Sequence, residues 1–470
     1  MQHGFEAQKS LRNRYEIKNK GRRFHYKIST FVYLYEFNRD VCLYHSLFMK
    51  KIFLSKKEFK DLIEFLKNNK KEETKTIKEL YEEGFLIKSR NEDAKLYKKA
   101  KSVVTDWSLK TLFIVVTDVC NFKCRYCFQN LTKYSKNKLL DDETIKRAIK
   151  TFAEETRNSN VPLSIFFYGG EPLVNYKVIR PVIEYIQQLK DKKILRQPCR
   201  IDIITNGSLI TEEIAKDALR YNITFGVSLD GFEHNHNSMR IYRNDMGTYK
   251  DVTRGIDILR KNGIDFSILC TVGPHNIDEI DKICEFFITE LGCKNMNLTL
   301  PLCKIGKGPA FSKQIPMDYM LQQIIKTFKV VRKHGAFEGT VFKHLTSFIQ
   351  EQIFRGECDG MGSQVVIAPN GKIGPCLAFI NEKGFFMDSD MSSFDIKNIP
   401  VFRKFVRGVA MNTPACKTCP ALGVCGGGCM YNRFVKNGTL KKPDTYYCKF
   451  IKGLLEWAIG ELYKNYTSAP

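Results

Sequence analysis

Between residues 112 and 300 the chain alternates short apolar strands with amphipathic helices, and this rhythm restricts the fold more than any other feature. The predicted strands are Leu112–Val116, Leu163–Phe167, Arg200–Ile204, Ile223–Ser228, Asp265–Cys270 and Met296–Leu300. The predicted helices are Asp142–Thr156, Tyr176–Lys190, Thr211–Tyr221, Tyr249–Asn262 and Ile277–Leu291. Strands separated in this way are parallel and joined by right-handed crossovers. Six units are too few for an eight-fold barrel, so we predict an α/β fold with a partial (β/α)6 TIM-like barrel and chemistry at the carboxyl ends of its strands.

Other segments surround this barrel. Residues 1–22 are polar and basic, which predicts a mobile arm. Residues 23–105 follow a β–β–α–α–β pattern, residues 106–310 contain the barrel, and residues 311–357 predict a helical bridge. Residues 358–470 are rich in Gly, Pro and Cys and show little periodicity. A segment with so little apolar pattern needs another source of stability, and bound metal supplies one.

Composition excludes some classes of protein. With 43% hydrophobic and 27% charged residues, the chain can bury a large core and is not wholly disordered. It has no run of eighteen apolar residues and no secretory signal, so we expect a cytoplasmic protein without a membrane partner. The net charge of +24 suits a polyanion or an acidic peptide. The lysines, however, are spread through helical stretches such as residues 56–71, which is typical of solvated faces and makes a nucleic-acid partner a weak prediction.

The cysteines form two groups. A cytosolic chain keeps its thiols reduced, so sixteen cysteines indicate metal binding or chemistry rather than disulfides. Three lie between residues 120 and 127, and seven lie between residues 358 and 448. The others read as small core residues; they are Cys42, Cys199, Cys270, Cys284, Cys293 and Cys303.

Cys120, Cys124 and Cys127 follow the first barrel strand with the spacing CxxxCxxC. Three thiolates on one loop can hold three irons of a [4Fe–4S] cluster and leave the fourth iron for a small chelating ligand. A structural zinc site is the alternative, but such a site needs four protein ligands. The spacing therefore favours an open cluster.

This run resembles the cluster motif of radical S-adenosylmethionine (SAM) enzymes, in which an aromatic residue precedes the last cysteine, as Tyr126 does here. The resemblance implies that SAM chelates the fourth iron. It also implies that a flavodoxin- or ferredoxin-type reductant drives SAM cleavage to a 5′-deoxyadenosyl radical, which removes a substrate hydrogen. Cys120, Cys124 and Cys127 would then be catalytic as well as metal-binding, while the protein positions the substrate.

Two more motifs match this family in order along the barrel. Gly169-Gly170-Glu171-Pro172 follows the second strand and resembles the GGEP motif that receives the SAM amino group. Glycines let the backbone approach a ligand closely, and Glu171 can accept a hydrogen bond from an ammonium. A plain Gly-Gly turn is the alternative. Thr205-Asn206-Gly207 ends the third strand and makes Asn206 a candidate SAM contact.

The fourth strand ends in Ser228-Leu229-Asp230-Gly231 and resembles the SLDG…H…R stretch of a subfamily, with His236 and Arg240 beyond it. The resemblance implies that Ser228 and Arg240 hold the SAM carboxylate, for which a guanidinium fork is suited. Arg243 competes with Arg240 for this role, and His236 is expected to be structural rather than a general base. Val272, just past the fifth strand, either covers the SAM adenine or fills the core.

The carboxyl-terminal cysteines resemble a SPASM domain, which carries two auxiliary [4Fe–4S] clusters and brings the expected total to three. The match includes Cys358, Gly371, Cys376, the CxxCxxxxxCxxxC run of Cys416, Cys419, Cys425 and Cys429, and the final Cys448. The family's pairing assigns Cys416, Cys419, Cys425 and Cys448 to one cluster. It assigns Cys358, Cys376 and Cys429 to the other.

That second cluster lacks a fourth cysteine in the family's usual place. Its open iron could bind a substrate thiolate, because metal coordination deprotonates a thiol. Cys303 is the alternative fourth ligand. The residue after Cys376 is Leu377, where sulfatase maturases have the Asp that serves as their base. Oxidation of a Ser or Cys to an aldehyde needs such a base, so its absence argues against that reaction.

The resemblance covers roughly residues 110–450 and implies an enzyme that modifies peptides or proteins. Residues 23–105 resemble the winged-helix-like element of peptide maturases, where a leader peptide adds as a strand. We therefore predict a radical SAM peptide maturase that installs thioether (Cys sulfur to carbon) cross-links in a ribosomally synthesised precursor. A sulfatase maturase and a carbon–carbon cross-linking maturase are the alternatives. An RNA-binding iron–sulfur protein is a remote third.

Overall fold

A curved parallel sheet is the framework of the molecule. The computed structural model describes residues 26–68, 73–105, 108–127, 139–300 and 315–468. The predicted arm at residues 1–22 and Cys303 lie outside these residues. The six barrel strands are β6 (Thr111–Thr117), β7 (Leu163–Gly169), β8 (Cys199–Thr205), β9 (Ile223–Ser228), β10 (Phe266–Thr271) and β11 (Asn295–Thr299). They pair in sequence order and all in parallel, which confirms the partial (β/α)6 barrel.

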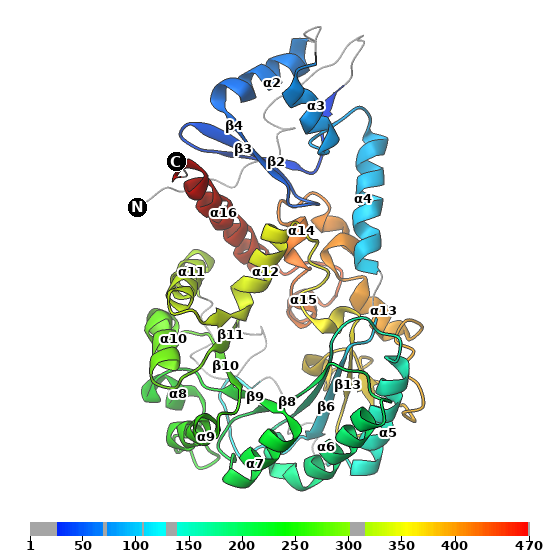
Figure 1. Cartoon of the computed structure of the whole chain (residues 1–470), viewed down its shortest axis with the longest axis vertical. Coiled ribbons are helices and arrows are strands. Elements are labelled where there is room, and N and C mark those ends of the chain that lie inside the picture. The colour runs from blue at the N-terminus through cyan, green and yellow to red at the C-terminus, as the bar shows by residue number, and fades with distance from the viewer. Residues whose placement is uncertain (1–25, 69–72, 106–107, 128–138, 301–314, 469–470) are drawn as a thin grey trace.

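Amphipathic helices cover the outer side of this sheet (Figure 1). They are α5 (Asp142–Glu155), α6 (Tyr176–Asp191), α7 (Glu212–Tyr221), α8 (Glu233–Met239), α9 (Tyr249–Lys261) and α10 (Ile280–Thr289). Two of them, α5 and α7, begin at capping residues, because the side chains of Asp141 and Thr211 accept hydrogen bonds from the backbone of Thr144 and Ile214. The short α8 was not among the predicted helices.

The carboxyl-terminal region extends the barrel sheet, which the sequence analysis missed. Strand β13 (Gln364–Ile367) pairs in parallel with β6, and β14 (Ile373–Gly374) follows in antiparallel. Strand β12 (Phe337–Glu338) pairs with β11 at the opposite edge. The cysteine-rich region is therefore joined to the barrel edge directly beside β6, the strand that leads into the first cysteine motif.

The rest of the carboxyl-terminal half is helical between irregular loops. Its α-helices are α11 (Met317–Lys333), α12 (Gly339–Gln350), α13 (Pro400–Val406), α14 (Leu422–Cys425), α15 (Met430–Asn437) and α16 (Thr445–Ser468). None of the described helices is both long and apolar enough to span a bilayer.

A small β domain occupies the amino-terminal end (Figure 1). Strands β2 (Val32–Glu36), β3 (Asp40–His45) and β4 (Lys51–Ser55) form an antiparallel sheet, and β1 (Lys27–Ile28) pairs with β5 (Leu86–Ile87). Helices α2 (Lys56–Asn68) and α3 (Lys75–Glu82) follow the sheet, and α4 (Arg90–Thr105) leads to the barrel. Ser55 and Glu58 form a reciprocal capping box at the start of α2.

Both faces of this three-stranded sheet are buried. Val32, Leu34, Val41 and Leu43 belong to a separate apolar core with α2 and α3. Residues of the opposite face, including Cys42 and Tyr44, belong to the main core of the molecule. Because side chains alternate along a strand, one face holds the small domain together and the other attaches it to the cysteine-rich region.

Candidate active site

The loop that carries Cys120, Cys124 and Cys127 is fixed by the segment after α8. The backbone amide of Lys123 donates to the carbonyl of Ile241 at 2.7 Å, and that of Arg125 donates to Met239 at 2.9 Å. Phe122 also packs edge-on against Tyr242, with ring centroids 5.1 Å apart. The predicted cysteine loop and the predicted SAM-carboxylate segment are therefore direct neighbours, although more than 100 residues separate them.

The donor set of this loop suits a polynuclear cluster. Every described cysteine is a free thiol. Burial raises the pKa of both Cys120 and Cys124 to about 12, so a metal must displace their protons. Among the described residues, no three Cys, His, Asp or Glu side chains converge closely enough to hold a single metal ion. Three thiols on one loop suit a cluster in which each binds a different iron, whereas a structural zinc site needs four protein ligands.

Gly169 and Gly170 are required by the cysteine loop itself. A Cβ atom on Gly169 would lie 2.5 Å from the carbonyl oxygen of Thr117, and one on Gly170 would lie 2.5 Å from that of Val119. The amide of Gly170 donates to Thr117 at 3.0 Å, and that of Glu171 donates to Val119 at 2.9 Å. Any side chain at either glycine would push this backbone away, so the two glycines let β7 end against the loop.

Glu171 is fully buried and faces the protein. Its carboxylate accepts hydrogen bonds from Thr205 Oγ1 at 2.6 Å, from the Asn206 amide at 2.6 Å and from the Leu173 amide at 3.0 Å. Burial raises its pKa to about 7, against these three donors. The side chain that we expected at the SAM ammonium thus ties the end of β7 to the end of β8. Pro172, next in the motif, opens the turn at Pro172–Asn175.

Glu171→Gln should weaken this junction. An amide keeps one acceptor oxygen and points an NH2 group at a backbone or hydroxyl donor, so a buried hydrogen bond is lost at a cost of about 1–3 kcal/mol. We expect a corresponding decrease in the free energy of unfolding, measured by denaturant titration, together with weaker SAM binding. Glu143→Gln, at an exposed position on α5, is the matched control and should change neither. A stability equal to that of the wild type would contradict the role given to Glu171.

Asn206 connects the third strand to the cysteine loop. Its side-chain amide donates to Asn121 Oδ1 at 2.8 Å, and its own Oδ1 accepts from the Ser208 hydroxyl at 2.7 Å. Asn121 lies between Cys120 and Cys124 and in turn donates to Ser208 at 3.0 Å. The sequence analysis missed Asn121, because the sequence does not reveal the hydrogen-bond partner of an asparagine in a loop.

Asp230 is the centre of the site, and the sequence analysis quoted it without giving it a role. It is fully buried, and it accepts hydrogen bonds from the Tyr126 hydroxyl and from Arg240 Nε, the latter at 3.2 Å. His275, also missed, lies 3.7 Å away. Burial favours the neutral acid, but the charge of Arg240 and the contact with His275 outweigh it, so the pKa of Asp230 lies well below its ordinary value. Asp230 therefore fixes Tyr126 beside the Arg240 guanidinium.

The two candidate arginines differ in their surroundings. Arg240 is buried, with its guanidinium carbon 5.3 Å from the centre of the Tyr126 ring. Arg243 is exposed, and its Nε donates to the backbone carbonyl of Cys120 at 3.2 Å. Both thus contact the cysteine loop, but only Arg240 lies inside the barrel end.

The other predicted residues near this site have the following places. Ser228 is the last residue of β9 and is half-buried. Val272 is fully buried, and its amide donates to Thr299 at 3.0 Å. His236 uses both ring nitrogens inside the protein, with Nδ1 at 3.3 Å from the Asp230 amide and Nε2 at 3.0 Å from the Thr248 hydroxyl. This arrangement is that of a structural histidine, and burial lowers its pKa to about 3.

The carboxyl-terminal cysteines fall into two groups. Cys358, Cys376 and Cys429 form the Cys376 group: burial, and then the thiolate charges of Cys358 and Cys429, raise the pKa of Cys376. The Cys419 group consists of Cys416, Cys419, Cys425 and Cys448. Burial raises the pKa of Cys416 to about 11, and the thiolates of Cys419 and Cys448 add to that increase and to the increase at Cys425.

A buried arginine supports anionic clusters at these positions. Arg433 is fully buried and donates to the carbonyls of Gly427 and Leu440, but its Nε has no hydrogen-bond partner. None of the described carboxylates forms an ion pair with Arg433. Burial lowers the pKa of Arg433, and the charges that oppose this effect are those of cysteines from both groups. A buried cation needs an anion, which a thiolate-ligated iron–sulfur cluster would supply.

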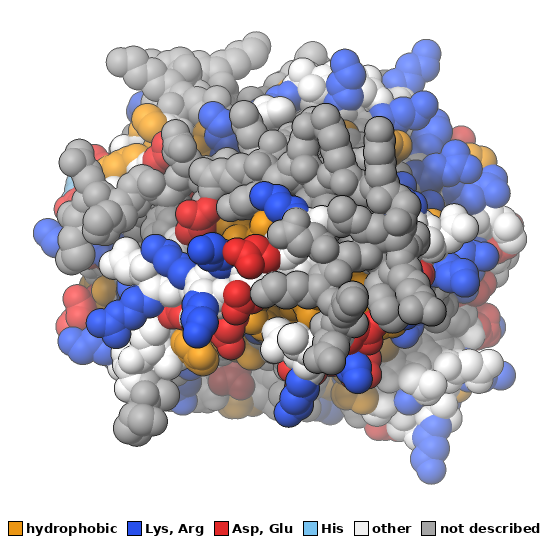
Figure 2. Space-filling model, turned by 90° about the horizontal axis from the view of Figure 1, so that it is seen from above, with side chains coloured by type: hydrophobic (Ala, Val, Ile, Leu, Met, Phe, Trp, Pro, Cys, Tyr) orange, Lys and Arg blue, Asp and Glu red, His pale blue; other side chains and the backbone are white. Residues whose placement is uncertain are grey.

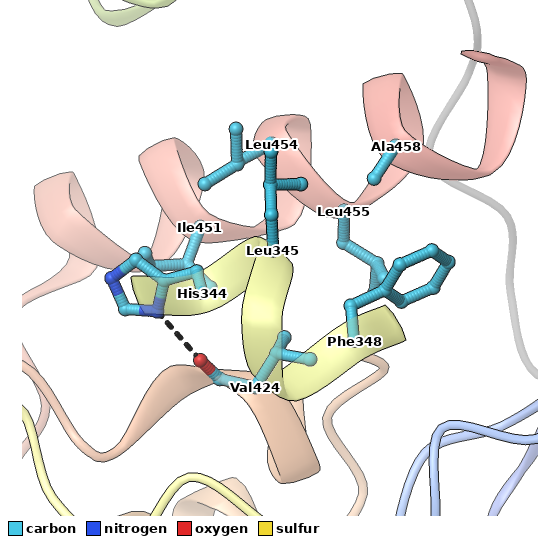
Figure 3. Close-up of a pocket in the computed structure, with 8 residues that line it drawn as sticks. All are labelled: His344, Leu345, Phe348, Val424, Ile451, Leu454, Leu455 and Ala458. Atoms are coloured by element: carbon cyan, nitrogen blue, oxygen red, sulfur yellow. Dashed lines mark hydrogen bonds between the residues drawn. The ribbon is translucent and has the colours of Figure 1, made fainter. Parts of the chain in front are cut away.

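The helices around the Cys419 group also enclose an apolar pocket (Figure 3). Its walls come from α12, α14 and α16. The single polar ring, His344, donates from Nδ1 to the carbonyl oxygen of Val424 at 2.7 Å. With that ring engaged and the other lining residues apolar, the pocket is part of the packing that holds Cys425 at the end of α14.

Comparison with known proteins places this geometry in a family. The family model described as "Radical SAM superfamily" matches residues 114–287. The radical SAM cyclopropyl synthase TigE of Paramaledivibacter caminithermalis is 26% identical over 81% of this chain and 81% of its own length. A cysteine-type anaerobic sulfatase-maturating enzyme of Clostridium novyi is 26% identical over 76% of this chain and 96% of its own length. Streptococcus suis SuiB, solved with its precursor peptide SuiA, has a TM-score of 0.55 and 18% identity over 90% of this chain and 99% of its own.

The cysteine loop after β6, the family match and the shared fold together define a radical SAM enzyme. The barrel residues 114–287 match the radical SAM superfamily, and the relatives of the longer chain include TigE and a sulfatase-maturating enzyme. The cofactors of this chain accordingly include a [4Fe–4S] cluster and SAM.

Proposed function

We propose that this enzyme is a peptide maturase that forms thioether cross-links between a cysteine sulfur and a carbon of a ribosomally synthesised precursor. Its relatives include enzymes named for the modification of proteins or peptides, and SuiB is solved with a precursor peptide. The proposal for the cross-link itself rests chiefly on the Cys376 group.

Residues at the barrel end would hold the cofactors. Cys120, Cys124 and Cys127 would bind the [4Fe–4S] cluster, and Ser228 and the free donors of Arg240 would face the SAM carboxylate. The backbone at Gly169 and Gly170 would face its amino group, since the Glu171 side chain is occupied by protein donors. When bound, these cofactors supply a 5′-deoxyadenosyl radical that removes hydrogen from a substrate carbon. Tyr126 and Asp230 would keep Arg240 oriented throughout.

The Cys376 group supports a role for a substrate thiol. A [4Fe–4S] cluster has four irons, and this group offers three thiols. The cysteines whose charges most raise the pKa of Cys376 are Cys358 and Cys429. One coordination position would therefore be open to a cysteine of the peptide. Leu377, the apolar residue that opens the turn after Cys376, gives no base at the position that sulfatase maturases use.

The amino-terminal domain suits recognition of an extended peptide. Among the described strands, β2 and β4 each pair only with β3, so each has one free edge. A leader peptide could add there as a further strand, with its backbone satisfying those donors and acceptors. We propose this edge as the leader site, and a flavodoxin- or ferredoxin-type protein as the source of electrons.

Replacing the cysteines of a precursor peptide should abolish the cross-link. With a cysteine-containing peptide, we expect a mass loss of about two hydrogens per thioether and the loss of one thiol that iodoacetamide can alkylate, because the sulfur and the carbon each give up one hydrogen. The Cys→Ala peptide should bind but show no such mass loss. A peptide that is modified equally well without its cysteines would exclude thioether formation and favour the carbon–carbon cross-linking alternative.

Two other functions are separated by simple assays. A sulfatase maturase would convert a Ser or Cys of a sulfatase peptide to an aldehyde, which a hydrazine reagent detects. An RNA-binding protein would bind RNA with a steep dependence on salt. The face in Figure 2 shows Lys and Arg mixed with Asp and Glu over its described part, which gives no support to an extended basic RNA surface there.

A further inference from the structure

The amino-terminal sheet directs two tyrosines toward the Cys419 group. Tyr33 of β2 and Tyr44 of β3 are cross-strand partners. Both side chains are buried, with 5% and 0% of their surface exposed. They lie on the face of the sheet that is turned away from α2 and α3, because Val32, Leu34 and Leu43 fill the other face.

The hydroxyl groups of these tyrosines lack protein partners. The Oη atoms of Tyr33 and Tyr44 are both buried, and neither forms a hydrogen bond within the described structure. Buried hydroxyls are normally paired, so two adjacent orphans on one face need an acceptor that the polypeptide itself does not supply.

Cys419 is the cysteine whose charge acts on both phenols. After burial, the charge of a Cys419 thiolate is the next largest influence that raises the pKa of Tyr33, and the same holds for Tyr44. The charges of Cys42 and Glu351 have smaller effects on Tyr44, and among the cysteines only Cys419 affects Tyr33. Cys419 is therefore the candidate ligand beside which an acceptor for these phenols would lie.

The turn between β3 and β4 is bonded to the segment that follows Cys419. The amide of Gly423 donates to the carbonyl of Ser46, just past β3, at 2.8 Å, and the amide of Phe354 donates to Gly423 at 2.8 Å. A Cβ on Gly423 would lie 2.0 Å from Met49 Sδ and 2.7 Å from the Ser46 oxygen. A second attachment comes from α4, where the Tyr97 hydroxyl donates to the carbonyl of Met411 at 2.6 Å.

We propose that Tyr33 and Tyr44 donate hydrogen bonds to sulfur atoms of the cluster at the Cys419 group, so that the amino-terminal domain sets the reduction potential of that cluster. The proposal rests on the cluster assignment made under the proposed function. Hydrogen bonds to cluster sulfurs are one of the determinants of reduction potential. Because the positive end of each O–H dipole stabilises the added electron, these bonds should make the cluster easier to reduce.

The test is an EPR-monitored redox titration of the reconstituted full chain carrying Tyr33→Phe, Tyr44→Phe or both. We expect each single variant to shift the midpoint potential of one auxiliary cluster to more negative values, and the double variant to shift it further. Tyr35→Phe is the matched control: it lies two residues from Tyr33 on the same face and contacts Tyr44, but no cysteine of the group acts on it. It should leave the potential unchanged. Unshifted potentials in the double variant, with wild-type iron content, would overturn the proposal.

A second variant separates hydrogen bonding from packing. Tyr33→3-fluorotyrosine keeps the shape of the side chain but makes the phenol more acidic and thus a stronger donor. The potential should then shift in the positive direction, opposite to that of Tyr33→Phe, and no shift would overturn the proposal even if the Phe variants lose iron. Iron analysis distinguishes failure of the hydrogen-bond proposal from failure of the cluster assignment. A wild-type enzyme without auxiliary iron would refute the cluster assignment.

Discussion

We expect Cys124→Ala to abolish the reductive cleavage of SAM. Cys124 is the middle of the three thiols, and the amides of Lys123 and Arg125 on either side of it are hydrogen-bonded to Ile241 and Met239. The loop therefore has little freedom to offer another ligand in its place. With dithionite as reductant, the yield of 5′-deoxyadenosine measured by chromatography should fall to that of a reaction without enzyme.

Iron analysis makes this result specific. Anaerobically reconstituted wild-type enzyme should contain about twelve irons, and the Cys120/Cys124/Cys127→Ala variant about eight, as expected for three four-iron clusters of which one is lost. Cys199→Ala is the control, because Cys199 is a buried thiol at the start of β8 outside both cysteine groups. It should retain full iron and full SAM cleavage. A wild-type yield of 5′-deoxyadenosine from Cys124→Ala would contradict the assignment of the loop.

The barrel was predictable from the sequence because its short, mostly apolar strands alternate regularly with amphipathic helices. Strands β6 to β11 lie within two residues of their predicted bounds, although β8 and β11 contain polar residues. Strands β12 to β14 have two to four residues each, and β13 exists because it pairs with β6. Short strands defined by a distant partner leave no local signal, which is why they were missed.

For the site, the sequence identified many of the residues but not the groups that they contact. The motif at Gly169 to Pro172 was recognised, and it was assigned to the ligand with a plain Gly-Gly turn as the alternative. In the structure the glycines allow close contact with the backbone of Thr117 and Val119. The Glu171 carboxylate accepts hydrogen bonds from Thr205 and Asn206. Asp230 could have been found, because a carboxylate between apolar strand residues and a downstream arginine signals a buried ion pair. Asn121 and His275 carried no comparable signal.

Cys419→Ala should damage folding as well as turnover. The region from Cys358 to the start of α16 consists of short helices, two short strands and loops. Its cysteines influence a buried Arg433 that has no carboxylate partner among the described residues. Removing one ligand would lose or weaken a cluster that contributes to folding. We expect a fall in Tm of about 10 °C, which corresponds to roughly 3 kcal/mol for a region of this size.

The same substitution should also loosen the amino-terminal domain, because Gly423, on the helix that follows Cys419, is bonded to Ser46 at the end of the small sheet. Limited proteolysis should cut the Cys419→Ala variant faster than the wild type near α4, which joins the domain to the barrel. Cys293→Ala, a buried cysteine beside β11, is the control for the loss of a buried thiol alone and should keep its iron, its Tm within a few degrees and its resistance to protease. A Cys419→Ala enzyme that is soluble, retains all its iron and turns over at the wild-type rate would show that the carboxyl-terminal region is held by its own packing, and the attachment of the amino-terminal domain would then be independent of any cluster.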